Sequence, residues 1–431
     1  MRSSAGRGVT LVALAMGLVG FATPLAAQTV TVTLDEAIDR ALTVNPAIIQ
    51  AQGQVHTAAA AKREVIGSWL PSLNTNSSWS RNSSSRFDDR TQTTITGSSS
   101  SMSAGISSSL TLFDGFRRFA EGRSASADIE SADAALVNQE FQITLQTKQA
   151  FFNALAADEL VRLSELSIQR AENQLQISAQ KLAAGSATRS DTLRSRVELA
   201  NAQLQRLQAQ TQRATAEANL ARLIGVDGTV RAVTDSALFA PVMVDTAALR
   251  EEAQANAPSV VQADAALRSA RANLAVSRSQ YFPTLNSSFS KNYSGQSFDA
   301  LNGSWSLRLS VSWPIFNGFT RETGIARSAA TRDAAVAQAE DARRQVNATL
   351  TQYLASLASA QLRLQIAQVS QAAAAEDLRV QQERYRLGAA TIVEVLTSQV
   401  SLDQAGADIV QARLDYLVAK AQIEALIGRE L

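Results

Sequence analysis

The sequence lacks several residue types on which other classes of protein depend. Its 431 residues contain no cysteine and a single histidine, His56. Without cysteine the chain can form no disulfide, and it cannot carry the lipid-modified cysteine of bacterial lipoproteins. One histidine without a cysteine or a second histidine beside it makes a poor metal site, and neither a nucleophile–base pair nor a phosphate-binding loop is present. We therefore expect a protein that is not an enzyme and that holds no cofactor or metal.

Long apolar runs and a marked excess of one charge are missing as well. The one apolar run, at 9–21, follows Arg2 and Arg7 and precedes the small residues Ala26 and Ala27. This pattern predicts a secretory signal peptide at 1–27, because the run is too short to span a bilayer. No other stretch of about 18 apolar residues exists, so no transmembrane helix is expected. Removing the two signal arginines leaves 40 − 2 = 38 basic against 39 acidic side chains, which gives no indication of nucleic acid as a partner.

The sequence that remains is duplicated. LFDGF at 112–116 matches IFNGF at 315–319 with an offset of 203, and the same offset aligns LIG at 223–225 with LIG at 426–428. The prolines at 46 and 71 match those at 258 and 283 with an offset of 212, so the first copy contains nine extra residues. We expect this insertion in an exposed loop at about 86–101. The predicted organisation is a first repeat at 28–225, a connecting segment at 226–245 and a second repeat at 246–431.

Each repeat is expected to contain a helix followed by a β-hairpin. The helices are predicted at about 34–67 and 246–280, and the hairpins at about 71–113 and 283–316, with strands at 71–87, 102–113, 283–293 and 304–316. From Trp305 to Trp313 every second residue is large and apolar, and Ser306, Arg308, Ser310 and Ser312 lie between them. Such alternation indicates a strand with one apolar and one polar face. Strands of about 9–11 residues with these faces suit an outer-membrane wall around an aqueous lumen.

A very long helix is predicted after each hairpin. No glycine or proline occurs between Gly122 and Gly185 or between Gly324 and Gly388, so each helix could reach about 90 Å. A turn near 185 or 388 then leads into a shorter return helix. In the second repeat a 4-3-4-3-4 spacing, typical of a coiled-coil seam, joins Val346, Leu350, Tyr353, Leu357, Ala360 and Leu364.

The number of strands indicates an assembly. Four strands per chain cannot close a transmembrane barrel, which needs about eight or more. Open strand edges are not tolerated in lipid, so several chains must combine their strands. The predicted fold class is therefore a mixed α+β membrane protein with an internal two-fold repeat, in which strands form the wall and long helices form a tube.

The duplicated motifs resemble those of the TolC-like outer-membrane efflux proteins. The resemblance covers essentially the whole mature chain and rests on LFDGF with IFNGF, on the glycine turns KLAAGSATRSDTL and RYRLGAATIVEVL, and on the paired LIG endings. It implies a homotrimer with a twelve-strand outer-membrane barrel, four strands from each protomer, continuous with a periplasmic α-helical barrel. The partners it implies are outer-membrane lipid, a periplasmic adaptor (membrane fusion) protein and an inner-membrane pump of the RND, ABC or MFS type.

The resemblance also implies an iris-like gate at the helix tips. The gate candidates are Tyr385, three residues before the second turn glycine, and Glu394 and Asp191, each six residues after its turn glycine. The family's gate arginine and a second aspartate are replaced here by Ala390 and Thr397, so the resemblance does not support two carboxylates per tip. Two other interpretations stay open. The acids can be ordinary residues near a helix start, and Tyr385 can be a seam residue three heptads beyond Leu364.

Two further sets of residues complete the predicted site. The adaptor-contact tips implied by the resemblance are Gly185, Ser186, Gly388 and Ala389. The two glycines match the family's tips, whereas their neighbours Ala184, Ser186, Leu387 and Ala389 differ from the best-known family pattern. Both glycines can also be read simply as turn formers. The alternation with serine favours a membrane girdle of aromatic side chains, made by Trp69, Trp79, Tyr281, Trp305 and Trp313.

The function favoured by these observations is a passive outer-membrane exit duct of a tripartite efflux system, which conducts small molecules delivered by an inner-membrane pump. One alternative is an outer-membrane channel for type I protein secretion. Another is a trimeric surface adhesin, which would leave the duplication unexplained. The cargo, the pump and the adaptor cannot be read from the sequence.

Overall fold

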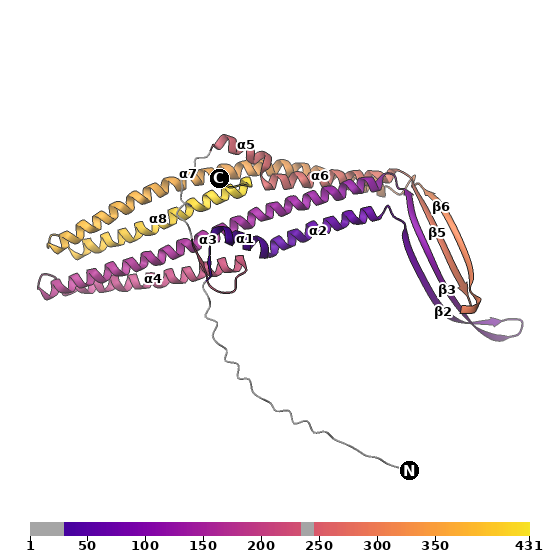
Figure 1. The fold of residues 1–431 in the computed structure, drawn as a ribbon, viewed down its shortest axis with the longest axis horizontal. Coiled ribbons are helices and arrows are strands. Elements are labelled where there is room, and N and C mark those ends of the chain that lie inside the picture. The colour runs from indigo at the N-terminus through magenta and orange to yellow at the C-terminus, as the bar shows by residue number, and fades with distance from the viewer. Residues whose placement is uncertain (1–29, 234–244) are drawn as a thin grey trace, which may run out of the picture.

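The computed structural model describes residues 30–233 and 245–431 (Figure 1). The predicted signal peptide and part of the predicted connecting segment lie outside these ranges. A helical bundle forms most of the molecule, and a sheet extends from one end of it. None of the helices in the described ranges is long and apolar enough to cross a membrane.

Two helices of equal length determine the length of the bundle. Helices α3 (Arg117–Ala183) and α7 (Thr320–Arg386) have 67 residues each, which corresponds to about 100 Å. Both run from the sheet to the opposite end of the molecule, where α4 (Arg189–Ile224) and α8 (Ile392–Ile427) begin (Figure 1). The return helices have 36 residues each and end near the middle of the bundle. The predicted long helices and shorter return helices are confirmed.

Four short helices pack beside the sheet-proximal halves of α3 and α7. They are α1 (Leu34–Val44), α2 (Pro46–Gly67), α5 (Thr246–Asn256) and α6 (Pro258–Arg278). The prediction of one continuous helix in each repeat was wrong. A proline lacks the N–H for the helical hydrogen bond and disfavours helical geometry in the preceding residue. The new helix therefore starts at each proline, and the Asn45 side chain caps α2 by accepting from the N–H of Ala47 at 2.9 Å.

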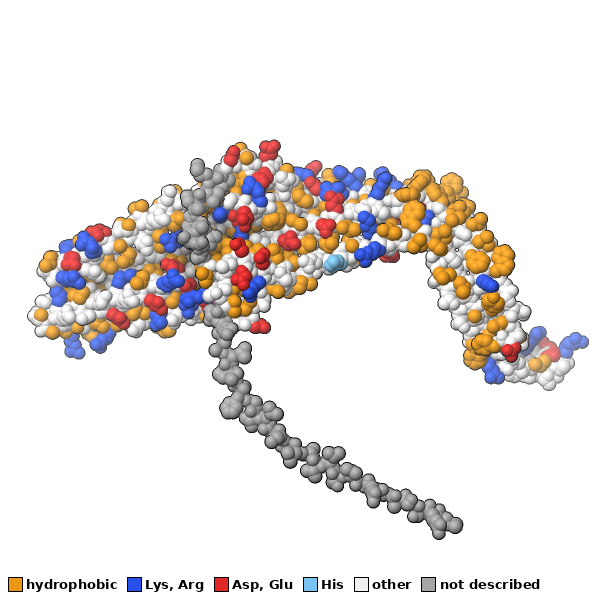
Figure 2. Space-filling model, viewed as in Figure 1, with side chains coloured by type: hydrophobic (Ala, Val, Ile, Leu, Met, Phe, Trp, Pro, Cys, Tyr) orange, Lys and Arg blue, Asp and Glu red, His pale blue; other side chains and the backbone are white. Residues whose placement is uncertain are grey.

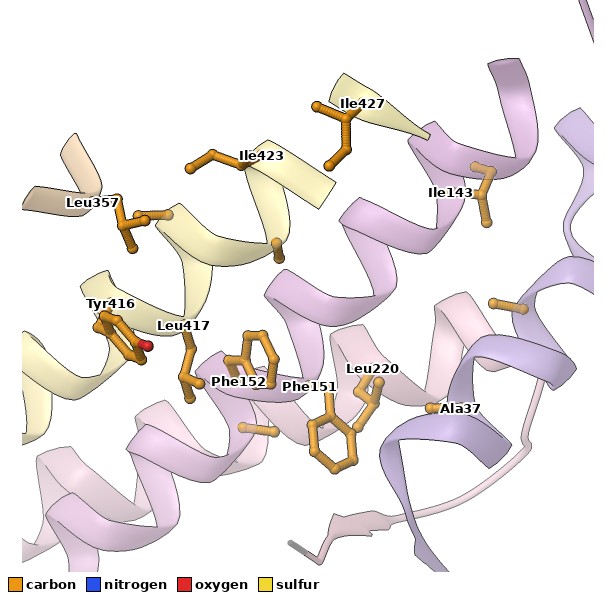
Figure 3. Packing of buried hydrophobic residues seen from close by; sticks show 14 of the residues in the cluster. Ala37, Ile143, Phe151, Phe152, Leu220, Leu357, Tyr416, Leu417, Ile423 and Ile427 are labelled. Carbon is orange, nitrogen blue, oxygen red and sulfur yellow. The ribbon is translucent and has the colours of Figure 1, made fainter. Parts of the chain in front are cut away.

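The largest buried core lies at mid-length, where the short helices and the ends of the return helices meet α3 and α7. Its largest fully buried side chains include Leu350 and, labelled in Figure 3, Phe151, Leu220, Tyr416 and Ile423. A parallel pair of short strands, β1 (Val30–Val32) and β4 (Val230–Ala232), adds to this core, and the sequence patterns gave no sign of it. The predicted seam on α7 is confirmed: Val346, Leu350, Leu357 and Ala360 are buried, and Tyr353 and Leu364 are partly buried.

The sheet has four antiparallel strands in the order β2-β3-β5-β6. Strands β2 (Ser72–Asp88) and β3 (Thr93–Phe113) have 17 and 21 residues, whereas β5 (Thr284–Gly295) and β6 (Asn302–Ser312) have 12 and 11. The expected first strand at 71–87 is confirmed, but the expected second strand at 102–113 was too short, because β3 already begins at Thr93. The nine extra residues of the first hairpin do not form a long loop, because Ser, Thr and Asn pair across the hairpin up to Asp88 and Thr93. The insertion extends the hairpin beyond its neighbours.

The register separates apolar from polar side chains. Residues directly opposite each other in an antiparallel pair lie on the same face. The apolar face carries Leu73, Trp79, Met102, Ile106, Leu110, Leu285, Phe289, Tyr293, Trp305, Leu307, Leu309 and Val311. The polar face carries mostly Ser and Asn, and hydroxyl pairs such as Ser290–Ser306 at 2.9 Å cross it. Figure 2 shows large hydrophobic groups on the sheet and its junction with the helices, and charged groups mainly on the bundle.

Candidate functional site

The junction between sheet and helices is built by the duplicated DGF and NGF motifs. Gly115 and Phe116 both have positive φ (70° and 65°), and Gly318 and Phe319 repeat this geometry (65° and 65°). A positive φ is costly for phenylalanine but not for glycine. The phenylalanine is held by its neighbours: the Phe113 and Phe116 rings pack edge to face with centroids 5.3 Å apart, as do Phe316 and Phe319 at 5.4 Å. The strained turn redirects the chain from strand to long helix.

Two of the predicted girdle aromatics lie at this junction, each under an arginine. The Arg118 guanidinium is 4.4 Å from the centre of the Trp69 ring, and that of Arg321 is 4.1 Å from the Tyr281 ring. Trp313 belongs to the same region, because its Nε1–H donates to the Tyr281 carbonyl at 3.1 Å. These contacts hold the three aromatic side chains at the end of the sheet next to the helices, two of them against a guanidinium group.

The other two girdle candidates lie on the apolar face, farther from the helices. Trp305 is 72% exposed and Trp79 is exposed as well. The register places Trp305 opposite Lys291, and Lys291 opposite Ile106. Trp79 lies opposite Met102, four residues farther along the same strand as Ile106. The two tryptophans are therefore staggered: Trp305 lies near the start of β6, at the end away from the helices, whereas Trp79 lies in the middle of the longer β2.

The helix tips are two copies of one turn. Gly185 (φ 73°) and Gly388 (φ 78°) follow the ends of α3 and α7 in the left-handed conformation. The N–H of Ser186 donates to the Lys181 carbonyl at 2.8 Å, and the N–H of Ala389 donates to the Arg384 carbonyl at 2.7 Å. These bonds satisfy helix-terminal carbonyls in the Schellman manner. All four predicted adaptor-contact residues are exposed at the tips, where a partner can reach them.

The two acids predicted as gate candidates each occupy the third position of a return helix. Asp191 Oδ2 accepts from the N–H of Thr188 at 3.0 Å, and Glu394 Oε2 accepts from the N–H of Thr391 at 2.6 Å. Each threonine hydroxyl accepts in return from the N–H of its acid, so both tips contain a capping box. The backbone N–H of Thr391, then its hydroxyl, lowers the pKa of Glu394. The acids thus have a structural role at the helix start, as one open interpretation expected.

Tyr385 is buried at the second tip, in a cluster with Leu378, Ile392 and Val395. Burial, and then the charge of Asp191, raises the pKa of its phenol, so the hydroxyl stays protonated. The Lys181 ammonium lies 4.3 Å from the centre of the Tyr385 ring and donates to the Tyr385 carbonyl. The structure therefore brings Tyr385 near Asp191 and adds Lys181, which links the end of α3 to the end of α7.

Several of these residues were not singled out from the sequence. Thr188 and Thr391 form Thr-x-x-Asp and Thr-x-x-Glu patterns, a readable sign of a capping box. Lys181 gave no such signal, because only the fold brings α3 against α7 at the tips. Among the described residues, no group of three or more His, Cys, Asp or Glu side chains is placed to hold a metal ion.

Comparison with known proteins agrees with this architecture. Residues 37–226 and 249–429 match the profile of the family described as outer membrane efflux protein. The chain is 28% identical over 410 residues to the pyoverdine export outer membrane protein OpmQ of Pseudomonas aeruginosa, covering 92% of this chain and 85% of OpmQ.

Solved structures show the same fold. CusC superposes with a TM-score of 0.80 at 18% identity and 92% coverage of both chains. The CmeC outer membrane channel of Campylobacter jejuni gives 0.78 at 16% identity, covering 92% of this chain and 85% of CmeC. The protein is located in the outer membrane of Gram-negative bacteria, and its helical part lies in the periplasm. The chain belongs to the outer membrane efflux protein family.

Proposed function

We propose that three copies of this chain form a passive exit duct for small molecules, in which twelve strands close a barrel and α3, α4, α7 and α8 continue it as a tube. An adaptor at the tips would connect the duct to an inner-membrane pump. The two sequence repeats are proposed to form equivalent halves of each protomer. The observation that carries this proposal concerns the two equivalent glycines Gly115 and Gly318. The first is covered by a side chain, and the second is not covered by any described residue.

The contact is at the junction glycines. A Cβ added to Gly115 would lie 2.5 Å from Cβ of Phe282, the residue that precedes the second hairpin. A Cβ added to the equivalent Gly318 would have no atom of the described residues within 4 Å. The repeat offset of 212 makes Leu70 the counterpart of Phe282, and Leu70 is 68% exposed. Leu70 of a neighbouring copy would therefore cover Gly318, and repeating this head-to-tail contact generates a closed ring.

The sheet supports the same ring. Strands β2 and β6 are its two outer strands, and lipid leaves no room for their unpaired backbone groups. Pairing β6 of one copy with β2 of the next satisfies both edges. Three copies then supply twelve strands, above the minimum of about eight for a transmembrane barrel.

The stagger of Trp79 and Trp305 gives the strand tilt that such a barrel requires. The two rings are offset by four residues along the strands, about 13 Å, and by three strand spacings, about 14 Å. If both mark one level of the membrane, the strands are tilted by about 40°, within the range of about 35–45° for transmembrane barrels.

The assembly is tested by the mass of the purified protein in detergent. Light scattering combined with size exclusion should give a trimer, and planar bilayers should show channels. Leu70→Asp at the proposed contact should shift the population toward monomer, whereas Leu73→Asp lies on the lipid-facing side and should not weaken the ring contact in detergent. A monodisperse monomer of the unmutated chain would rule out the duct.

The tips carry a separate prediction. We propose that Asp191 and Glu394 of three copies ring the narrow end of the duct, with the Tyr385 hydroxyl nearby. Asp191→Asn with Glu394→Gln removes six charges from the trimer and keeps an acceptor for each capping box. In single-channel recordings, block of the current by divalent cations added on the periplasmic side should weaken, while the helix content stays unchanged.

The pH dependence of the block is a second readout. Because the pKa of Glu394 is lowered, block of the unmutated channel should persist as the pH falls through 4.5. Unaltered block in the double variant would leave the acids with their capping role alone.

A further inference from the structure

One charged side chain stands on the polar face of the sheet where all four strands lie side by side. Arg308 lies opposite Ser288 on β5, and Ser288 lies opposite Ser109 on β3. Its neighbours on its own strand and face are Ser306 and Ser310. Arg86 and Asp88, the other charged residues on this face, belong to the part of the first hairpin that extends beyond β5 and β6.

Arg308 has no countercharge in the described part of the chain. It is exposed, and among residues 30–233 and 245–431 it forms no ion pair and no hydrogen bond through its side chain. No aspartate or glutamate occurs in the four strands before Asp88 at the end of β2. The polar groups around it are hydroxyls, which can donate further hydrogen bonds to an anion.

Along the direction of β6, Arg308 lies between two tryptophans, Trp305 and Trp313. Trp305 is three residues away on the outer side, about 10 Å, and Trp313 is five residues away on the inner side, about 17 Å. The guanidinium therefore stands within the height of the membrane, on the face opposite the lipid. A charge at this depth is costly unless it faces water, and such charges usually serve a transport function.

We propose that the three copies of Arg308 form an anion-binding ring in the lumen of the barrel, selective for small molecules that carry phosphate or carboxylate groups. This inference rests on the trimeric duct proposed above. Twelve strands about 4.8 Å apart and tilted by about 40° enclose a backbone cylinder of about 12 Å radius. Arginines that extend inward from this wall come within about one Debye length, 8–10 Å, of any ion on the axis.

The chemistry of the ring determines its ligand. Guanidinium presents paired N–H donors that match the oxygens of carboxylate and phosphate, and it stays charged at every physiological pH. Rings of arginine or lysine are a known basis of anion and phosphate selectivity in pores. Because the ring lies at the barrel end and the acids lie at the helix tips, the two ends of the duct favour opposite charges.

Binding of inorganic phosphate to purified trimers at low ionic strength tests the ring directly, because the outer mouth is accessible whatever the state of the tips. Equilibrium dialysis should show about one phosphate fewer per trimer in Arg308→Ser than in the unmutated protein. Arg308→Lys keeps the charge but not the paired donors, and its phosphate affinity should fall about tenfold. The matched control is Arg81→Ser, which removes three charges per trimer from the apolar face of the same sheet and should change nothing.

Reversal potentials in a potassium chloride gradient provide the second measurement. The chloride-to-potassium permeability ratio should fall about two- to fivefold in Arg308→Ser and stay unchanged in Arg81→Ser. Trimeric channels whose phosphate binding and permeability ratio are the same with and without Arg308 would overturn the ring and leave the duct intact. Failure of the unmutated chain to form trimers or channels would instead reject the duct itself.

Discussion

Leu309→Arg is expected to impair insertion of the barrel by about 2–4 kcal/mol, the cost of an arginine at the midplane of a transmembrane barrel. Leu309 is 64% exposed on the apolar face, four residues from Trp305 and four from Trp313. In the proposed barrel it therefore faces the centre of the lipid. The measurement is the fraction of folded trimer recovered in lipid vesicles across a urea series.

Ser310→Arg is the control, because it introduces the same side chain one residue farther along the strand. Ser310 lies opposite Asn286 on the polar face, so its substitution places the charge in water rather than in lipid. We expect a loss much smaller than that of Leu309→Arg. Equal losses would mean that the two faces of the sheet have been assigned incorrectly.

Lys148→Met is expected to destabilise the helical part by about 3–5 kcal/mol, the usual effect of breaking a buried ion pair by removing one partner. The Lys148 ammonium lies 2.7 Å from Oε2 of Glu424, and both side chains are nearly inaccessible to solvent. Without the lysine, the Glu424 carboxylate stays buried in the mid-length core with weaker compensation: Lys420 lies 3.8 Å away, and the N–H of Leu431 donates at 3.3 Å. Unfolding followed by the helical circular dichroism signal gives the loss.

Lys420→Met serves as the matched control, since it removes a lysine from the same carboxylate at a more accessible and more distant position. Such a pair contributes about 1 kcal/mol or less. Replacing both members of the buried pair, Lys148→Met with Glu424→Leu, should recover most of the stability, because no charge is then left uncompensated. A double variant as unstable as Lys148→Met alone would show that the side chains act by packing rather than by charge.

Several features of the fold could be predicted because they depend on local rules. Helix length follows from the absence of glycine and proline over more than sixty residues, and the two faces of β6 follow from the alternation between Trp305 and Trp313. The tip turns follow from glycine in the left-handed conformation. The duplicated motifs, taken together in one register, also led to the family that the comparisons show.

Two features of the fold differ from the sequence-based expectation: the helix breaks at the prolines and the position of the inserted residues. The helix breaks at Pro46 and Pro258 have a local cause, since proline is favoured at the first position of a new helix. The sequence predicts a loop for the insertion in the first hairpin, because serines and threonines do not distinguish a loop from a strand that is polar on both faces. Only the pairing of β2 with β3 up to Asp88 and Thr93 decides between them.

The sequence by itself determined the exported, cysteine-free character of the chain, its duplication, and the periodicity of its long helices and of β6. These properties depend on residues close together in the chain. The tertiary structure alone decided the contacts between distant segments: Lys181 against Tyr385, Lys148 against Glu424, and Phe282 against Gly115. It also left Gly318 without a neighbour in the described part of the chain. It showed in addition that Arg308 is the one charged residue on the polar face where all four strands lie side by side, because that depends on the register of strands drawn from both halves of the chain.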